Sequence, residues 1–235
     1  MCSSQETNSR PDTKEITNNK ASYDLVKKMR ASFWVLAPLL AKSGYAEVSL
    51  PGGCAIGTRP INLYLKILKE MNINYTINNG YVVAKREGPI KGLNFKLEKK
   101  SVGCTHFFLM LASLASGTSK LSNASCEPEV IHLGSLLIKM GAKIKGLGSK
   151  KIIIEGVEKL NSITEVIPSD RIETGTFAIA VSATGGKIKL ENTNYEENKL
   201  LFNILEKTGS IINKSKNSIS PKNLKNNPKR SFRTK

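Results

Sequence analysis

The chain has 235 residues, of which 40% are hydrophobic, so it is long enough to bury a core as one large or two small domains. No apolar stretch approaches the roughly 18 residues that a membrane-spanning helix needs, and we expect no membrane partner. The first 20 residues are polar and lack the apolar segment of a signal peptide, which favours a cytoplasmic location.

The formal net charge of +17 raises the question of nucleic-acid binding. Much of that charge lies in residues 207–235, where lysines alternate with asparagine and serine and aromatic residues are nearly absent. Proteins that bind nucleic acids usually combine basic grooves with stacking aromatic residues or a recognition motif. We therefore expect no nucleic-acid partner, although a basic surface would also attract anionic substrates.

The four cysteines, Cys2, Cys54, Cys104 and Cys126, form no CxxC pair, and the chain has only two histidines. This spacing favours free thiols over a disulfide framework or a zinc site. We expect no metal and no cofactor. Cys104 and Cys126 are interpreted as packing residues.

In chain order, residues 1–20 are polar and predicted to lack a fixed structure. From Tyr23 onward one pattern recurs about three times. A polar or glycine-containing segment precedes a helix, a glycine and a strand, and a second helix, a turn and two short strands follow. The first helices are expected at residues 33–42, 107–115 and 177–183, and the strands after them at residues 46–50, 119–122 and 187–190.

The second helix of each unit ends before a residue that tolerates a left-handed backbone. These residues are Asn72, Gly141 and Gly209. The strands expected at residues 81–84 and 151–155 are rich in β-branched residues. A unit of roughly 70 residues, repeated in this way, predicts stacked α/β subdomains with helices inside and sheets outside.

The most informative stretch is the glycine-rich segment at residues 52–63, which contains Cys54 and Arg59. Its glycines allow a close backbone approach to a ligand, and the helix expected to start at Pro60 would present unpaired N–H groups to an anion. A thiolate is favoured at such a place. From the spacing alone, a reactive cysteine in an anion site and an ordinary surface loop are equally good interpretations.

Several collinear motifs decide between these interpretations. Residues 52–63, with YDLVKKMRAS at 23–32, KKSVG at 99–103, EPE at 127–129 and DRIETGT at 170–176, closely resemble the UDP-N-acetylglucosamine 1-carboxyvinyltransferase family. The resemblance covers roughly residues 21–212. It implies an α/β fold, the inside-out α/β barrel of repeated subdomains found in enolpyruvyl transferases.

The resemblance also implies a domain organisation. Residues 21–168 would form a first globe of two repeat units, residues 169–220 a partial second globe of one unit, and residues 221–235 a basic tail. The related enzyme of aromatic amino-acid synthesis shares the fold but does not use the Cys54 loop, so we set it aside.

The activity implied by the resemblance is transfer of the enolpyruvyl group from phosphoenolpyruvate to the 3′-hydroxyl of UDP-N-acetylglucosamine. This is the first committed step of peptidoglycan synthesis, needed for cell shape and division. Cys54 matches the family's general acid, which can bond covalently to phosphoenolpyruvate and is alkylated by fosfomycin. The matching substrate-binding residues are Arg30, Arg59, Pro60, Ile61, Asn62, Leu63, Lys99, Lys100, Ser101 and Val102.

Departures from the family pattern qualify that expectation. Asn62 stands where aspartate is usual, Cys126 where arginine is common, and His132 where aspartate is common. The family's Lys-Asn pair for phosphoenolpyruvate and its catalytic aspartate have no match in these residues. We therefore expect this chain by itself to be weakly active or inactive and a complementary fragment to be a partner. The alternative is a UDP-sugar-binding module without catalysis.

Overall fold

The computed structural model describes residues 16–51, 61–216 and 218–223. The chain divides into two compact units, unit 1 at Met1–Thr164 and unit 2 at Glu165–Lys235. The division lies four residues before the boundary expected from the sequence after residue 168.

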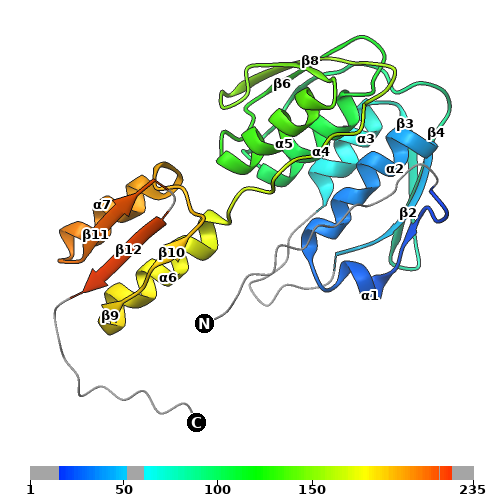
Figure 1. Cartoon of the computed structure of the whole chain (residues 1–235). Helices are drawn as coiled ribbons and strands as arrows, with labels where there is room; N and C mark the ends of the chain where they lie inside the picture. Colours follow the sequence, from blue (N-terminus) through cyan, green and yellow to red (C-terminus); the bar gives the residue numbers. More distant parts are fainter. Residues whose placement is uncertain (1–15, 52–60, 217, 224–235) are drawn as a thin grey trace. The chain divides into compact units, whose positions relative to one another are not determined.

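Unit 1 contains two four-stranded sheets built to the same plan (Figure 1). The first has the order β1-β2-β4-β3 and the second the order β5-β6-β8-β7. In each sheet the first pair is parallel and the other pairs are antiparallel. The strands are β1 (Lys20–Ala21), β2 (Tyr45–Ser49), β3 (Ile73–Asn78), β4 (Tyr81–Arg86), β5 (Asn94–Lys96), β6 (Thr118–Ser122), β7 (Lys143–Lys145) and β8 (Lys151–Glu155).

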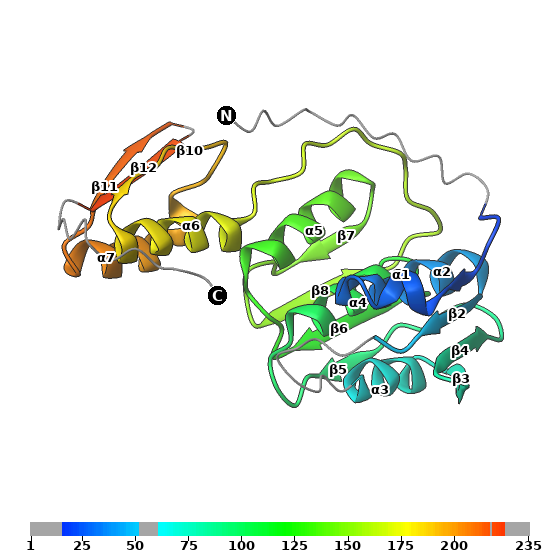
Figure 2. The same cartoon turned by 90° about the horizontal axis from the view of Figure 1, so that it is seen from below.

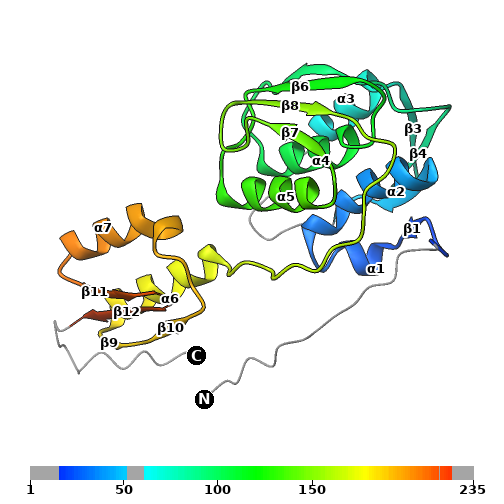
Figure 3. The same cartoon turned by 45° about the horizontal axis from the view of Figure 1, so that its top comes forward.

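Each sheet has one covered face and one exposed face. In β8 the side chains of Ile152 and Ile154 are buried, while those of Lys151, Ile153 and Glu155 are exposed. This alternation follows from the two-residue period of a strand. In Figure 3, strands β6, β7 and β8 run above helices α4 and α5. Figure 2 shows the first sheet beside helix α2.

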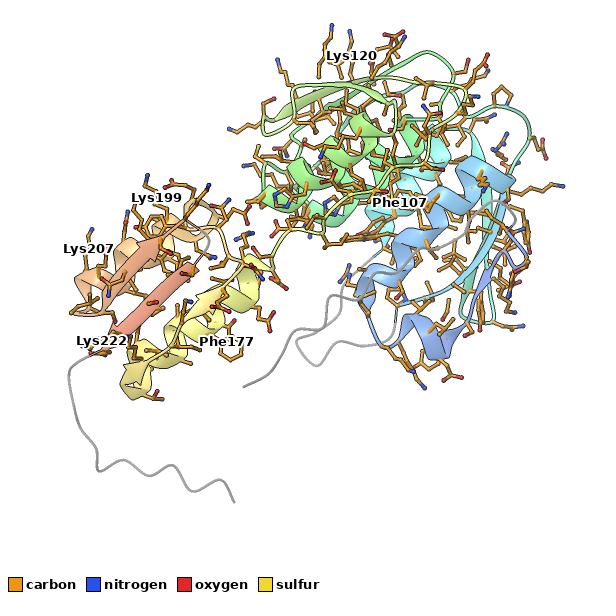
Figure 4. The ribbon with its side chains drawn as sticks, viewed as in Figure 1. Phe107, Lys120, Phe177, Lys199, Lys207 and Lys222 are labelled. Atoms are coloured by element: carbon orange, nitrogen blue, oxygen red, sulfur yellow. The ribbon has the colours of Figure 1, made fainter. Side chains whose placement is uncertain are left out.

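Each helix of unit 1 contacts a strand of one of these sheets. The helices are α1 (Tyr23–Val26), the 3-10 helix η1 (Arg30–Val35), α2 (Leu36–Ser43), α3 (Asn62–Glu70), α4 (Val102–Ala112) and α5 (Pro128–Lys139). Helix α4 packs against α2, α3 and α5 and is buried on nearly all sides. Phe107, labelled in Figure 4, is fully buried at its centre. A helix that is apolar all round belongs inside a core, which agrees with the expected arrangement of helices inside and sheets outside.

Unit 2 contains a third copy of the pattern. Its elements are α6 (Arg171–Thr184), β9 (Gly186–Lys187), β10 (Leu190–Glu191), the 3-10 helix η2 (Glu196–Asn198), α7 (Lys199–Lys207), β11 (Ile211–Ser215) and β12 (Ser218–Asn223). The sheet has the order β10-β12-β11, and β9 also pairs with β12. The small core contains Ala178, Phe202, Leu205 and Ile219.

Several local expectations need correction. The helix expected at residues 33–42 is split into η1 and α2, and α2 starts at Leu36. Pro38 then lies in the first turn of α2, where a missing N–H leaves no hydrogen bond unmade. The helices expected at residues 107–115 and 177–183 start earlier, because the side chains of Ser101 and Asp170 cap them.

The strand expected at residues 187–190 is divided into β9 and β10. Ile188 N–H donates to the Pro221 carbonyl at 3.2 Å, but Pro221 has no N–H to complete the ladder. Residues 221–223, assigned from the sequence to the basic tail, belong to β12.

Lys20 is also ordered, contrary to the expectation for residues 1–20. The Glu47 N–H donates to the Asn19 carbonyl at 2.9 Å, and Lys20 pairs with the Glu47 carboxylate at 2.5 Å. These contacts fix β1 beside β2.

The expected left-handed residues are confirmed. The backbone φ is 59° at Asn72, 107° at Gly141 and 96° at Gly209. Each follows the second helix of its unit, α3, α5 or α7. Glycine and asparagine are the residues that adopt this conformation most readily.

Candidate functional site

The sequence-predicted site residues come from three segments. Cys54, Arg59 and Pro60 lie outside the described residues. Arg30 is the first residue of η1. Ile61, Asn62 and Leu63 lie at the start of α3, and Lys99, Lys100, Ser101 and Val102 lie at the start of α4.

The start of α4 is a well-formed helix N-terminus. The Ser101 backbone is extended, and its Oγ accepts a hydrogen bond from the Cys104 N–H at 3.2 Å. The Ser101 carbonyl accepts from the Thr105 N–H at 3.0 Å and from Thr105 Oγ1 at 2.8 Å. The first N–H groups of a helix have no partner within the helix, so those of Val102 and Gly103 remain available to an anion.

Arg30 meets this helix start from a segment about 70 residues away in the sequence. Burial raises the pKa of the Cys104 thiol, and Arg30 and Lys99 partly oppose that rise through their positive charges. Arg30 also opposes the rise that burial causes in the pKa of Tyr64. Arg30 Nη1 is buried and has no hydrogen-bond partner among the described residues. The charges of Arg30 and Lys99 therefore both act on Cys104, whose N–H is capped by Ser101 in the first turn of α4.

Tyr64, on α3, connects these groups. Its hydroxyl oxygen accepts a hydrogen bond from Trp34 Nε1 at 3.2 Å. Its ring packs edge-on against Phe33 and Phe107, with ring centroids 5.4 and 5.3 Å apart. Sequence reasoning did not select Tyr64 as a site residue, because no local pattern distinguishes it from the other core residues of α3.

His106 lies on the other side of Trp34. The two rings meet edge-on with centroids 4.8 Å apart, and the His106 side chain is buried. Burial lowers the pKa of His106, and the Glu129 backbone with the Glu129 and Glu127 carboxylates opposes this. Neither ring nitrogen makes a hydrogen bond of normal geometry within the described residues. Sequence reasoning missed this residue too.

The residues at the start of α3 have different environments. Ile61 is buried in the core, Leu63 is partly buried against it, and the Asn62 side chain is exposed. Further along α3, Lys66 Nζ pairs with the Glu98 carboxylate at 2.6 Å. This exposed pair links α3 to the residue before Lys99.

Other kinds of site find no support in the described part of the chain. No three histidine, cysteine or acidic side chains gather there as metal ligands. Cys104 and Cys126 are free thiols, the first buried and the second partly exposed. None of the described helices is long and apolar enough to cross a bilayer.

Comparison with known proteins identifies the class. The chain belongs to the EPSP synthase (3-phosphoshikimate 1-carboxyvinyltransferase) family, whose model matches residues 3–231. Within this class the similar curated relatives are UDP-N-acetylglucosamine 1-carboxyvinyltransferases. That of Rhodopseudomonas palustris (strain HaA2) is 48% identical over 199 residues, covering 85% of this chain and 46% of the relative. That of Bartonella quintana (strain Toulouse) is 46% identical over 231 residues, covering 94% of this chain and 54% of the relative. The chain thus spans about half the length of these relatives.

Solved structures confirm the expected fold. The enolpyruvyl transferase NikO from Streptomyces tendae superimposes with a TM-score of 0.72 at 18% identity, covering 88% of this chain and 50% of that chain. EPSP synthase from Acinetobacter baumannii superimposes with a TM-score of 0.62 at 19% identity, and the match covers 82% of this chain and 46% of that chain. The chain therefore has the enolpyruvyl transferase fold, an inside-out α/β barrel of repeated subdomains, of which this chain forms part.

Proposed function

We propose that this chain binds UDP-N-acetylglucosamine as part of an enzyme that transfers enolpyruvyl from phosphoenolpyruvate to the 3′-hydroxyl of that sugar. The observation that carries the proposal is the meeting of Arg30, Lys99 and Ser101 at the start of α4. The 46–49% identity to curated relatives that carry this name supports the same choice.

The chemistry of this helix start suits a diphosphate. Free N–H groups at a helix N-terminus hold phosphate oxygens, the Arg30 guanidinium supplies charge-assisted hydrogen bonds, and Lys99 adds a second positive charge. The exposed Lys100 and Asn62, together with Arg59, Pro60, Ile61, Leu63 and Val102, complete the proposed substrate-binding set.

The proposed reaction is an addition followed by an elimination. The sugar hydroxyl gives up its proton to a base and its oxygen bonds to carbon 2 of phosphoenolpyruvate, while carbon 3 gains a proton from an acid and becomes a methyl group. Loss of a methyl proton then expels phosphate and restores the double bond. Cys54 is proposed as the acid that protonates carbon 3 and as the thiol that bonds to phosphoenolpyruvate.

The setting of this activity is also part of the proposal. The reaction would open peptidoglycan synthesis in the cytoplasm and so serve cell-wall formation and division. Phosphoshikimate, the substrate named in the family's description, is disfavoured because the relatives at 46–49% identity are UDP-N-acetylglucosamine enzymes.

Calorimetric titration of the full chain with UDP-N-acetylglucosamine tests the binding. We expect saturable binding that weakens about tenfold or more in Lys99→Ala, because a charge-assisted hydrogen bond is lost. Lys120→Ala, on the exposed face of β6, is the matched control and should bind as the wild type (Figure 4). An absence of sugar binding by the wild-type chain would contradict the proposal.

A phosphate-release assay with both substrates then tests for catalysis. Release that disappears in Cys54→Ser supports catalysis by this chain. Sugar binding without release is expected both of a chain that needs a complementary fragment and of a binding module without chemistry.

A further inference from the structure

We propose that Tyr64 is a positioning residue, which holds the Arg30 guanidinium at the start of α4 and so sets the affinity for the diphosphate of the nucleotide sugar. This inference rests on the proposed function and adds to it a residue that no motif contains. Tyr64 lies on α3, Arg30 on η1 and the anion-binding N–H groups on α4. The tyrosine hydroxyl is the group at which these three elements meet.

The first support is the set of partners of the hydroxyl oxygen. It accepts a hydrogen bond from Trp34 Nε1 at 3.2 Å, and the positive charge of Arg30 acts on the same hydroxyl by opposing the burial-raised pKa of Tyr64. Because Trp34 belongs to the same 3-10 helix as Arg30, this bond fixes η1, the helix that begins at Arg30, on α3. An arginine held in this way loses less conformational freedom when it meets a phosphate.

The second support is the close approach of Tyr64 to α4. A methyl group built on Gly103 would lie about 2.2 Å from the Tyr64 hydroxyl oxygen and 3.0 Å from Trp34 Nε1. The side chains of Tyr64 and Trp34 therefore occupy the space beside the first turn of α4 that any residue larger than glycine would fill. The absence of a side chain at position 103 is what allows Tyr64 to reach the helix start.

The third support is an unused donor. Arg30 Nη1 is buried without a hydrogen-bond partner among the described residues, which is unfavourable unless an acceptor arrives. Tyr64 holds η1 through Trp34, and the Arg30 Nη1 donor is left for a ligand. A phosphate oxygen at the free N–H groups of Val102 and Gly103 is an acceptor of the right charge.

A double-mutant cycle tests this role, with UDP-N-acetylglucosamine affinity measured by calorimetry on the full chain. Tyr64→Phe removes the hydroxyl and keeps the ring packed against Phe33 and Phe107. We expect it to weaken binding about tenfold, and Arg30→Ala to weaken binding at least as much. In the Arg30→Ala background, Tyr64→Phe should have almost no further effect, because the residue it positions is gone. Tyr75→Phe, on β3, is the matched control and should leave affinity unchanged.

The outcomes separate this inference from the proposed function. The positioning role is wrong if Tyr64→Phe weakens sugar binding equally in the wild-type and Arg30→Ala backgrounds, or if it weakens binding in neither. The proposed sugar binding would still stand in both cases. An absence of sugar binding by the wild-type chain would remove both. If Tyr64→Phe does not fold, Trp34→Phe takes its place in the cycle, because it removes the N–H that orients the hydroxyl. The same dependence on Arg30 is then expected.

Discussion

His106 is a buried histidine placed between an aromatic ring and two carboxylates. It faces Trp34 from η1 and Glu127 and Glu129 from the start of α5. Burial is the larger influence and lowers its pKa, so the folded chain binds a proton at this site less readily than the unfolded chain. His106 is therefore neutral in the folded chain at neutral pH.

The lowered pKa predicts a pH-dependent stability. As the pH falls below about 6.5, the ordinary histidine value, the unfolded chain takes up the proton first, so the free energy of unfolding decreases until the folded-state pKa is reached. In His106→Leu this decrease should be smaller, measured by urea unfolding at several pH values between 7.5 and 5. His132→Gln, at a partly exposed position, controls for the loss of a histidine. An unchanged pH dependence in His106→Leu would show that other groups cause it.

At the scale of elements, the start of α4 combines a stabilising cap with a functional surface. The Ser101 side chain satisfies the Cys104 N–H, and the first N–H groups of the helix stay available. The same cap fixes the direction of a helix that touches α2, α3 and α5. A change at Ser101 should therefore lower stability and sugar affinity together.

Ser101→Ala is expected to lower the free energy of unfolding by about 1 kcal/mol, the usual cost of losing a serine cap. Urea unfolding monitored by Trp34 fluorescence measures this, because Trp34 is the chain's one tryptophan and lies beside α4. Ser101→Asp should restore most of the stability, since aspartate also caps a helix, but not sugar affinity, since its charge repels phosphate. Equal recovery of both properties would contradict an anion site at this helix start.

The sequence predicted those features of the elements that depend on local backbone physics. Asn72, Gly141 and Gly209 mark the helix ends because few residues tolerate their conformation. The split of the first helix before Leu36 and the pairing of Lys20 with β2 were missed. The first depends on where the α-helical turn begins, and the second on backbone hydrogen bonds to a distant strand.

The candidate site was predictable only where it coincides with a motif. Arg30, Lys99 and Ser101 belong to recognisable segments, and the structure brings them together. Tyr64 and His106 carry no local signal, because their roles arise from contacts between η1, α3, α4 and α5. The contact of Trp34 with Tyr64 joins positions 30 residues apart, and that with His106 joins positions 72 residues apart.

At the scale of the whole molecule, the two units differ in how completely they bury their helices. In unit 1, α4 is covered on nearly all sides. In unit 2, α6 opens the corresponding repeat, but among its side chains only Thr174, Gly175 and Ala178 are buried. Figure 4 shows the Phe177 ring standing off the ribbon of α6. The side chains of Ile172, Phe177 and Ile179 are 59%, 46% and 48% exposed.

This exposed apolar surface predicts self-association of the chain. Exposed apolar patches favour contacts between molecules, and the +17 charge opposes them less as salt screens it. The double variant Phe177→Lys and Ile179→Lys should reduce association at about 0.5 M salt, measured by sedimentation velocity over a range of concentrations. Because both side chains are about half exposed, the urea midpoint of the variant should stay close to that of the wild type. Phe202→Lys, in the core of unit 2, is the contrasting control and should unfold that unit. Association unchanged by the double variant would show that the exposed Phe177 and Ile179 side chains are not where the chains meet.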